Sequence, residues 1–287
     1  MTNREHIRNP VEWTADQLWL ASLTVSSLAH SVRGSRDIPQ PAVRRIKAAD
    51  LRDVLTRGLE DFGAYRSDVI FIGLIYPLVG ILLAWLTFGY QLLPLLFPLA
   101  SGFALVGPIA AVGLYEMSRR REQGDRISWI DAFGVIRSPG FGAILVLGLV
   151  LLAIFLLWLL AATLIYQLTL GPEPPVSITA FVREVFTTSA GWTMTVVGVG
   201  VGFLFASLVL AISVVSFPLL LDRDVGLYSA VSTSIRAVAI NPGPMALWGL
   251  IVAGGLVIGL LPAFLGLIVV MPVLGHATWH LYRKVVR

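Results

Sequence analysis

Cysteine is absent from the 287-residue chain, which excludes disulfide bonds, thiolate metal sites and cysteine nucleophiles. Charged residues are scarce, at 13% of the sequence, against about 25% in an ordinary soluble domain. Four stretches contain no Asp, Glu, Lys or Arg at all: 69–115, 138–172, 185–221 and 237–282. Each exceeds the roughly 20 residues that cross a bilayer as a helix. The sequence therefore predicts an integral membrane protein.

Two of these stretches are too long for a single helix and must turn back on themselves. A helix over 69–115 would be about 70 Å long, more than twice the thickness of the hydrocarbon core. Turns are expected at 89–91 and 259–262, where glycine and proline occur. The predicted spans are about 69–88, 92–117, 141–170, 192–221, 245–261 and 263–282. This is an all-α, polytopic membrane helix bundle of about six transmembrane helices.

The basic residues fall almost entirely on one side of this arrangement. Of the 21 lysines and arginines, Arg183 alone would lie on the other side. Basic residues concentrate in cytoplasmic segments of membrane proteins, so we expect a multi-pass protein of the bacterial inner membrane with both termini in the cytoplasm. The same bias explains the net charge of +4, and no nucleic-acid partner is expected.

The region before the first span is predicted to be cytosolic. Residues 1–41 form one unit, a helix over about 10–30 followed by a linker, and residues 42–287 form the transmembrane domain. An amphipathic helix is expected over 42–67, with apolar residues such as Leu51 at helical spacing and Asp61 on another face. Such a helix lies either in the headgroup plane or against the cytosolic side of the protein itself.

A short motif points to internal repetition. The sequence FGAYRS at 62–67 recurs as FGVIRS at 133–138, and each copy ends a cytosolic helix and opens a hydrophobic span. A third cytosolic helix is predicted over 227–240. Prolines recur near the cytosolic ends of the even-numbered spans, at Pro108, Pro218 and Pro272. We therefore expect three hairpin repeats, each preceded by a cytosolic amphipathic helix; the alternative is the general frequency of Pro and Gly in membrane helices.

Small residues recur every four positions in two of the predicted spans. They are Gly198, Gly202 and Ala206 in one span, and Gly249 with Ala253 and Gly255 with Gly259 in another. Rows of this kind let helices approach closely. We expect them to serve packing inside the bundle, with dimerisation as the alternative.

Several segments carry a family resemblance. They are RGLEDFGAYRSDVIFIGLIYPLVG, GPIAAVGLYEMSRRR, SFPLLLDRDVG, NPGPMALWGLIVAGG and PVLGHATWHLYRKVV. Over about 45–287 the chain resembles the bacterial integral membrane family known as domain of unknown function 2189. The resemblance implies an inner-membrane protein without an established activity or assigned catalytic residues.

Some members of that family carry the label of a cytochrome c oxidase subunit, which the histidine count does not support. A haem–copper core needs about six histidine ligands, whereas this chain has four: His6, His30, His276 and His280. The last two are four residues apart on one helix face, but no third ligand is evident nearby. We interpret them as packing or interfacial residues beside Trp279 and expect no metal and no cofactor.

Catalytic chemistry has few candidate groups, because the predicted spans contain no charged side chain. Polar residues do gather near their cytosolic ends, and a polar mouth would form there if the even-numbered spans converge. Its predicted members are Glu116, Asp222, Arg223, Asp224, His276 and His280. The alternative is that each group is solvated separately.

These observations favour a non-catalytic scaffold, assembly or lipid-interacting factor. One alternative is a channel or transporter subunit for a neutral or lipid-like solute, and another is a membrane enzyme acting on lipid headgroups at the cytosolic face. Membrane lipids and other membrane proteins are the expected partners. A polar cavity inside the bundle would favour the alternatives, and a filled bundle would favour the scaffold.

Overall fold

The computed structural model of the chain describes residues 40–64, 73–89, 92–125 and 128–287, and all regular elements within these ranges are helices. In chain order they are α2 (Asp50–Ala64), α4 (Ile75–Gly89), the 3-10 helix η1 (Leu93–Leu95), α5 (Leu96–Ala110), α6 (Val112–Gln123), the 3-10 helix η2 (Trp129–Arg137), α7 (Phe141–Thr169), α8 (Ile178–Thr187), α9 (Ser189–Ser213), α10 (Ser216–Asp222), α11 (Leu227–Ile240), α12 (Pro242–Leu260) and α13 (Leu267–Val285). The predicted all-α class is confirmed. The helix expected over 10–30 lies outside the described residues.

Within the described ranges, four helical segments are long and apolar enough to cross a bilayer. They are Leu93–Gln123, Phe141–Thr169, Ser189–Asp222 and Pro242–Leu260. The 29 residues of α7 extend about 44 Å, well beyond the roughly 30 Å of the hydrocarbon core. Two helices at predicted spans are weaker candidates. The described part of α4 has 15 residues, and α13 carries histidines and basic residues in its second half.

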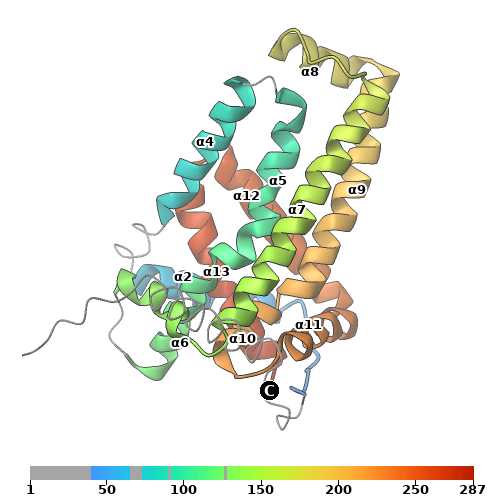
Figure 1. Cartoon of the computed structure of the whole chain (residues 1–287). Helices are drawn as coiled ribbons and strands as arrows, with labels where there is room; N and C mark the ends of the chain where they lie inside the picture. The colour runs from blue at the N-terminus through green and yellow to red at the C-terminus, as the bar shows by residue number, and fades with distance from the viewer. Residues whose placement is uncertain (1–39, 65–72, 90–91, 126–127) are drawn as a thin grey trace, which may run out of the picture.

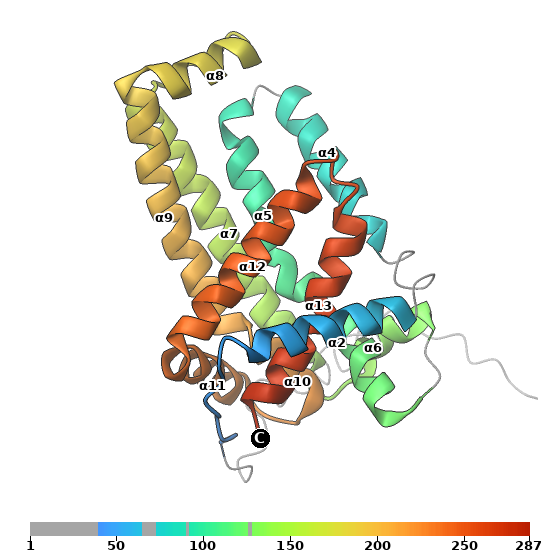
Figure 2. The ribbon, with the colours of Figure 1, turned by 180° about the vertical axis from the view of Figure 1, so that it is seen from behind.

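The two ends of the helix bundle differ in how they are built (Figures 1 and 2). At the end far from the C-terminus, α7 and α9 lie side by side and are connected through α8, and α12 connects directly to α13. At the other end α2, α6, α10 and α11 gather around the last turns of α13. This second end, which also holds the C-terminus, is called the base below.

The amphipathic helix expected over 42–67 begins later than predicted. α2 starts at Asp50, whose side chain accepts a hydrogen bond from the Lys47 backbone N–H at 2.7 Å. The preceding residues pair with the C-terminal segment instead: Val43 forms an isolated β-bridge with Val286. That pairing satisfies backbone groups that a longer helix would have used, and it joins the two segments at the base.

The buried face of α2 contains Leu51, Val54, Gly58 and Asp61, so Asp61 does not lie on another face as expected. This face packs on α13, which places α2 on the protein's own side. The two helices approach most closely at Gly58, where a Cβ atom would lie 2.7 Å from the Cβ atom of Ala277. Only a glycine fits at that point without moving one of the helices.

The three prolines near the base occupy different backbone settings. Proline removes one helical hydrogen bond and crowds the preceding turn. Pro108 lies in α5 three residues before the break at Ala111, whereas Pro218 is the third residue of α10, after the break that ends α9. Pro272 lies within α13, which continues through it. The positions recur as the sequence suggested, but the local structures are not equivalent.

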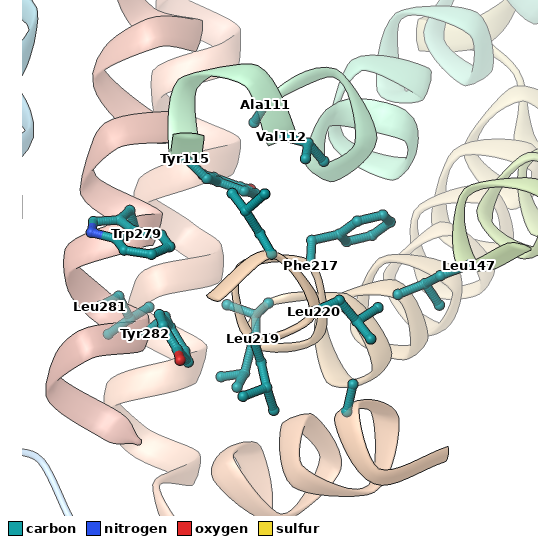
Figure 3. Close-up of a cluster of buried hydrophobic side chains, with 14 of the residues drawn as sticks. Ala111, Val112, Tyr115, Leu147, Phe217, Leu219, Leu220, Trp279, Leu281 and Tyr282 are labelled. Carbon is teal, nitrogen blue, oxygen red and sulfur yellow. The ribbon is translucent and has the colours of Figure 1, made fainter. Parts of the chain in front are cut away.

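A large part of the hydrophobic core lies at the base (Figure 3). Side chains from three elements meet there: Tyr115 from α6, Phe217 and Leu219 from α10, and Trp279 and Tyr282 from α13, each exposed by 2% or less. Farther along the long helices many large apolar side chains are exposed, as expected for surfaces that face lipid. The short helices thus bury large side chains at the ends of the long helices, whereas much of the long helices' surface is exposed.

Replacing Gly58 by leucine should separate α2 from α13. The new side chain has no room against Ala277, and overpacking of this kind costs about 1–3 kcal/mol of unfolding free energy. The matched control is Gly63→Leu on the same helix, because a Cβ atom at Gly63 would meet nothing within 4 Å. Thermal unfolding of both variants in detergent tests this, and equal unfolding temperatures would contradict the crossing.

Candidate functional site

Asp61 is a buried carboxylate at the centre of a polar cluster in the base. Its side chain is 8% exposed and connects three elements, since α2 carries Asp61, α6 carries Ser118 and α13 carries His280. The Ser118 hydroxyl donates to Asp61 Oδ2 at 2.5 Å, and His280 Nε2 lies 2.9 Å from the same oxygen. Arg121 donates to Oδ1 at 2.5 Å. A buried charge is tolerated only when it is paired in this way.

The cluster also fixes the proton position on His276. Ser118 has one hydroxyl hydrogen and donates it to Asp61, so its oxygen accepts from His276 Nδ1, 2.8 Å away. The proton of neutral His276 is therefore on Nδ1. The other ring nitrogen, Nε2, is buried without a hydrogen-bond partner.

Further ion pairs extend the cluster toward the end of α10. Glu122 lies 3.7 Å from His280 Nδ1 and 3.2 Å from Arg283 Nε. Arg283 also contacts Asp222 at 3.4 Å, and Asp222 accepts a 2.6 Å hydrogen bond from the Tyr282 hydroxyl. We call this chain of contacts the Asp61 network; its members are Asp61, Ser118, Arg121, Glu122, Asp222, His276, His280, Tyr282 and Arg283.

Glu116 belongs to a separate polar cluster that holds η2 against α6. Its side chain is 2% exposed and pairs with Arg119 and Arg120 at 2.8 and 2.7 Å. Arg120 in turn contacts Asp131 of η2 at 2.7 Å. A Cβ atom at Gly134 would lie 2.7 Å from the Arg120 guanidinium, so the glycine of the second FG motif makes room for this contact. The glycine of the first copy, Gly63, has open space around it.

The structure thus distributes the predicted mouth residues over different surroundings. His276, His280 and Asp222 lie in the Asp61 network, and Arg223 joins its edge through Asp222 at 3.7 Å. Glu116 lies in the other cluster, and Asp224 is exposed. Trp279 and Tyr282 are fully buried, so this face of α13 is packed inside the protein and forms no lipid-facing belt.

Sequence reasoning missed the residues that connect the predicted ones, chiefly Asp61, Ser118 and Glu122. For Asp61 a signal was available, because Leu51, Val54, Gly58 and Asp61 follow one helix face at spacings of three and four. A carboxylate that continues an apolar stripe predicts a buried partner. Ser118 and Glu122 carry no local signal of that kind.

The Asp61 network contains serine, histidine and aspartate but not in a catalytic arrangement. In a nucleophilic triad the histidine lies between the serine and the carboxylate, whereas here Ser118 itself lies between Asp61 and His276. Ser118 is 1% exposed, so a substrate has no access to its hydroxyl. Among the described residues no group of three or more potential ligands could hold a metal ion. The geometry is that of a structural connection between α2, α6 and α13.

A recess of about 500 Å³ lies among the long helices above the base. It is bordered by α5, α6, α9, α11, α12 and α13, with Leu105, Tyr115, Val209, Trp248, Leu256 and Gly275 in its wall. Its lining is predominantly apolar and has no charged side chain. Two hydroxyls in the wall are bonded to their own helices, Ser213 to Val209 O at 2.6 Å and Thr278 to Leu274 O at 2.7 Å. This interior is neither polar nor filled.

The rows of small residues serve two different purposes. Gly202 and Gly255 pack against neighbouring helices, with a Cβ atom 3.1 Å from Trp158 and 3.3 Å from Leu274 respectively. By contrast, Gly249 and Ala253 line the recess. The expectation of internal packing therefore holds for part of each row only.

Residues 96–222 match the DUF2189 family. Its description is predicted integral membrane protein, and the match confirms the resemblance over α5 to α10. No curated protein and no solved structure matches the chain. The DUF2189 match and the four apolar helices together establish an integral membrane protein.

Acid should weaken the base through Asp61. Burial raises the pKa of Asp61. Hydrogen bonds from His280 and Ser118, together with charge interactions with His276 and His280, lower it by more, so the pKa lies below its ordinary value of 3.8. A carboxylate whose pKa is lowered by folding stabilises the folded state at pH values above its pKa in the unfolded chain. That stabilisation is lost as the pH falls through the pKa of the folded state. Unfolding measured between pH 6 and about pH 3 should show this loss in the natural chain and a smaller one in Asp61→Asn.

The Asp61→Asn variant should also be less stable at neutral pH, by roughly 2–4 kcal/mol, because Arg121 and His280 lose their buried anionic partner. The matched control is Asp224→Asn, an exposed aspartate at the same end of the molecule. Chemical denaturation in detergent compares them. If both variants unfold alike, Asp61 does not have the central role described above.

Proposed function

We propose that the protein is a non-catalytic, lipid-binding scaffold of the bacterial inner membrane. The observation that carries this proposal is the apolar recess among the long helices. Its volume lies within the range of about 300–1,000 Å³ typical of ligand pockets. A recess without charged groups at this depth suits a hydrocarbon ligand, because water would find too few polar partners there.

The polar groups of the base support a structural role in this proposal. Asp61 is buried and paired with residues of α6 and α13, and the buried Glu116 pairs with Arg120 of its own helix, which contacts Asp131 of η2. They hold α2 and η2 against α6 and α13, instead of lining a cleft that a headgroup could enter. The enzyme alternative therefore gains no support from these groups.

We further propose six spans with both termini in the cytoplasm, with α4 and α13 as the two spans beyond the four candidates. This arrangement is supported by the base, where the Arg44 N–H donates to Val285 O at 2.8 Å. Residues near the start of the domain and the end of the chain thus share one face. Two points of a chain on the same side of a membrane are separated by an even number of spans, so the segment between them has an even number. In the same proposal, residues 1–41 form the cytosolic N-terminal unit.

Reporter fusions test this topology. Pro174 lies in the connection from α7 to α8, and Leu261 directly follows α12. Both connections lie at the end of the bundle opposite the base, so a reporter placed after either residue should be periplasmic. A reporter after Arg287 should be cytoplasmic and serves as the control. A cytoplasmic signal from the segment around α8 would contradict the six-span arrangement.

Lipid retention tests the proposed function. The protein is first extracted into nanodiscs that carry native lipid and is then exchanged into detergent. It should keep a reproducible ratio of phospholipid to protein through purification. Native mass spectrometry measures that ratio. Complete loss of lipid in mild detergent, or steady turnover of the lipid into products, would contradict a lipid-binding scaffold.

The same recess favours a second candidate, a subunit that moves a lipid-like solute across the membrane. In that case liposomes containing the protein should exchange labelled phospholipid between leaflets faster than protein-free liposomes. A scaffold leaves the exchange rate unchanged.

A further inference from the structure

We infer that the recess binds one acyl chain of a phospholipid from the cytoplasmic leaflet, with its headgroup beside α11 and the start of α12. This inference rests on the proposed lipid-binding function and names both the site and the ligand. Four observations carry it: the length of the recess, its chemical gradient, its opening and its fully buried wall.

The length of the recess matches one leaflet. Along α9 its wall runs from Phe203 to Val214 and along α12 from Pro242 to Leu256. At 1.5 Å per residue these stretches measure about 17 and 21 Å, close to the roughly 15 Å of half a hydrocarbon core once helix tilt is allowed for. A chain that entered from one surface would therefore reach the middle of the bilayer and no farther.

The chemical gradient along the recess gives the direction of entry. Three of its four hydroxyl-bearing residues, Tyr115, Ser213 and Thr278, lie toward the base, where Val238 and Pro242 also border it, and the fourth, Ser207, lies farther along α9. The far end is bordered by apolar residues such as Phe203 and Leu256. A phospholipid has its polar ester region at one end of the chain and its methyl group at the other. The base is the proposed cytoplasmic end, so the ligand comes from the cytoplasmic leaflet.

The opening of the recess lies between α9 and α12. Phe203 and Leu250 flank it, and each is 69% exposed. Between them the wall has small residues: Ala206 and Ala253 are exposed, and a Cβ atom at Gly249 would meet only Leu210, at 3.5 Å. No large side chain closes the entrance at this point. The surrounding medium is lipid, so an acyl chain is the molecule present at this opening in large excess.

The inner wall offers positions that only an inserted chain can contact. Trp248 is 1% exposed and Leu256 is 5% exposed, although both line the recess. By comparison, Leu160 and Leu164 on α7 are exposed by 56% and 48% and lie outside the recess. Contact with lipid at the first pair reports binding in the recess, and contact at the second pair reports the ordinary lipid surface.

Photocrosslinking in nanodiscs tests the inference. The probe is a phosphatidylglycerol with a diazirine in the middle of one acyl chain, diluted into unlabelled phosphatidylethanolamine and phosphatidylglycerol. After illumination, peptide mass spectrometry should find label at Trp248 and Leu256 as well as on the outer face of α7. Label confined to exposed positions such as Leu160 would overturn the inference.

A pair of variants adds the matched control. Ala253→Phe places a ring in the recess, whereas Gly254→Phe places the same ring one residue later, outside the recess wall and where a Cβ atom meets nothing within 4 Å. Ala253→Phe should reduce the label at Trp248 at least about tenfold, equivalent to about 1.4 kcal/mol. Gly254→Phe should leave it unchanged. Equal labelling in both variants would overturn the inference.

Two further measurements keep the outcomes distinct. Unfolding temperature and size-exclusion profile establish that each variant is folded, and Gly249→Leu replaces Ala253→Phe if the latter is not. If the natural protein and Ala253→Phe retain the same amount of phospholipid, lipid binding stands but the recess is not its site. If the natural protein retains none, the proposed function itself fails.

Discussion

The arrangement of the base depends on one buried charge, the carboxylate of Asp61. Isolated in a medium of low polarity, that charge would cost several kcal/mol. It is stable only because Ser118, Arg121 and His280 reach it from two other helices. The carboxylate therefore requires α2, α6 and α13 to be present together and in one register. Hydrophobic contacts alone would tolerate sliding between these helices, whereas hydrogen bonds of 2.5–2.9 Å do not.

The long helices and the base are held together by different physics. At the base, α10 and α13 contribute large side chains that exclude both water and lipid, as Phe217 and Trp279 do. Farther into the membrane the apolar side chains gain nothing from leaving lipid for the protein interior. Close contact there depends on shape, at glycines such as Gly202 against Trp158. Where shapes do not match, a recess results, and lipid can fill it at little cost.

The sequence predicted well those features that depend on neighbouring residues. Long runs without charge predicted the apolar helices, and the apolar spacing over 227–240 predicted α11 with the bounds that the structure has. The beginning of α2 was wrong because residues 42–44 pair with the C-terminal segment, a partner that local spacing cannot reveal. The candidate site was predicted in part: the two histidines of α13 were identified, but the partner of His280, Asp61, lies 219 residues away. Periodicity along one helix carries no information about such a contact.

The pairing of α2 with α13 also has a consequence for biosynthesis. The ribosome adds roughly 5–20 residues per second, so the sequence separation of 219 from Asp61 to His280 takes roughly 10–45 s to make. During that interval the apolar face of α2, which carries the anionic side chain of Asp61, is not yet covered by α13. Ser118 and Arg121 of α6 emerge earlier and can pair with Asp61, but α2 lacks α13 while the intervening helices enter the membrane. The base is consequently completed only by the last residues to emerge. A chain that stops early leaves the apolar face of α2 exposed for a chaperone or protease to recognise.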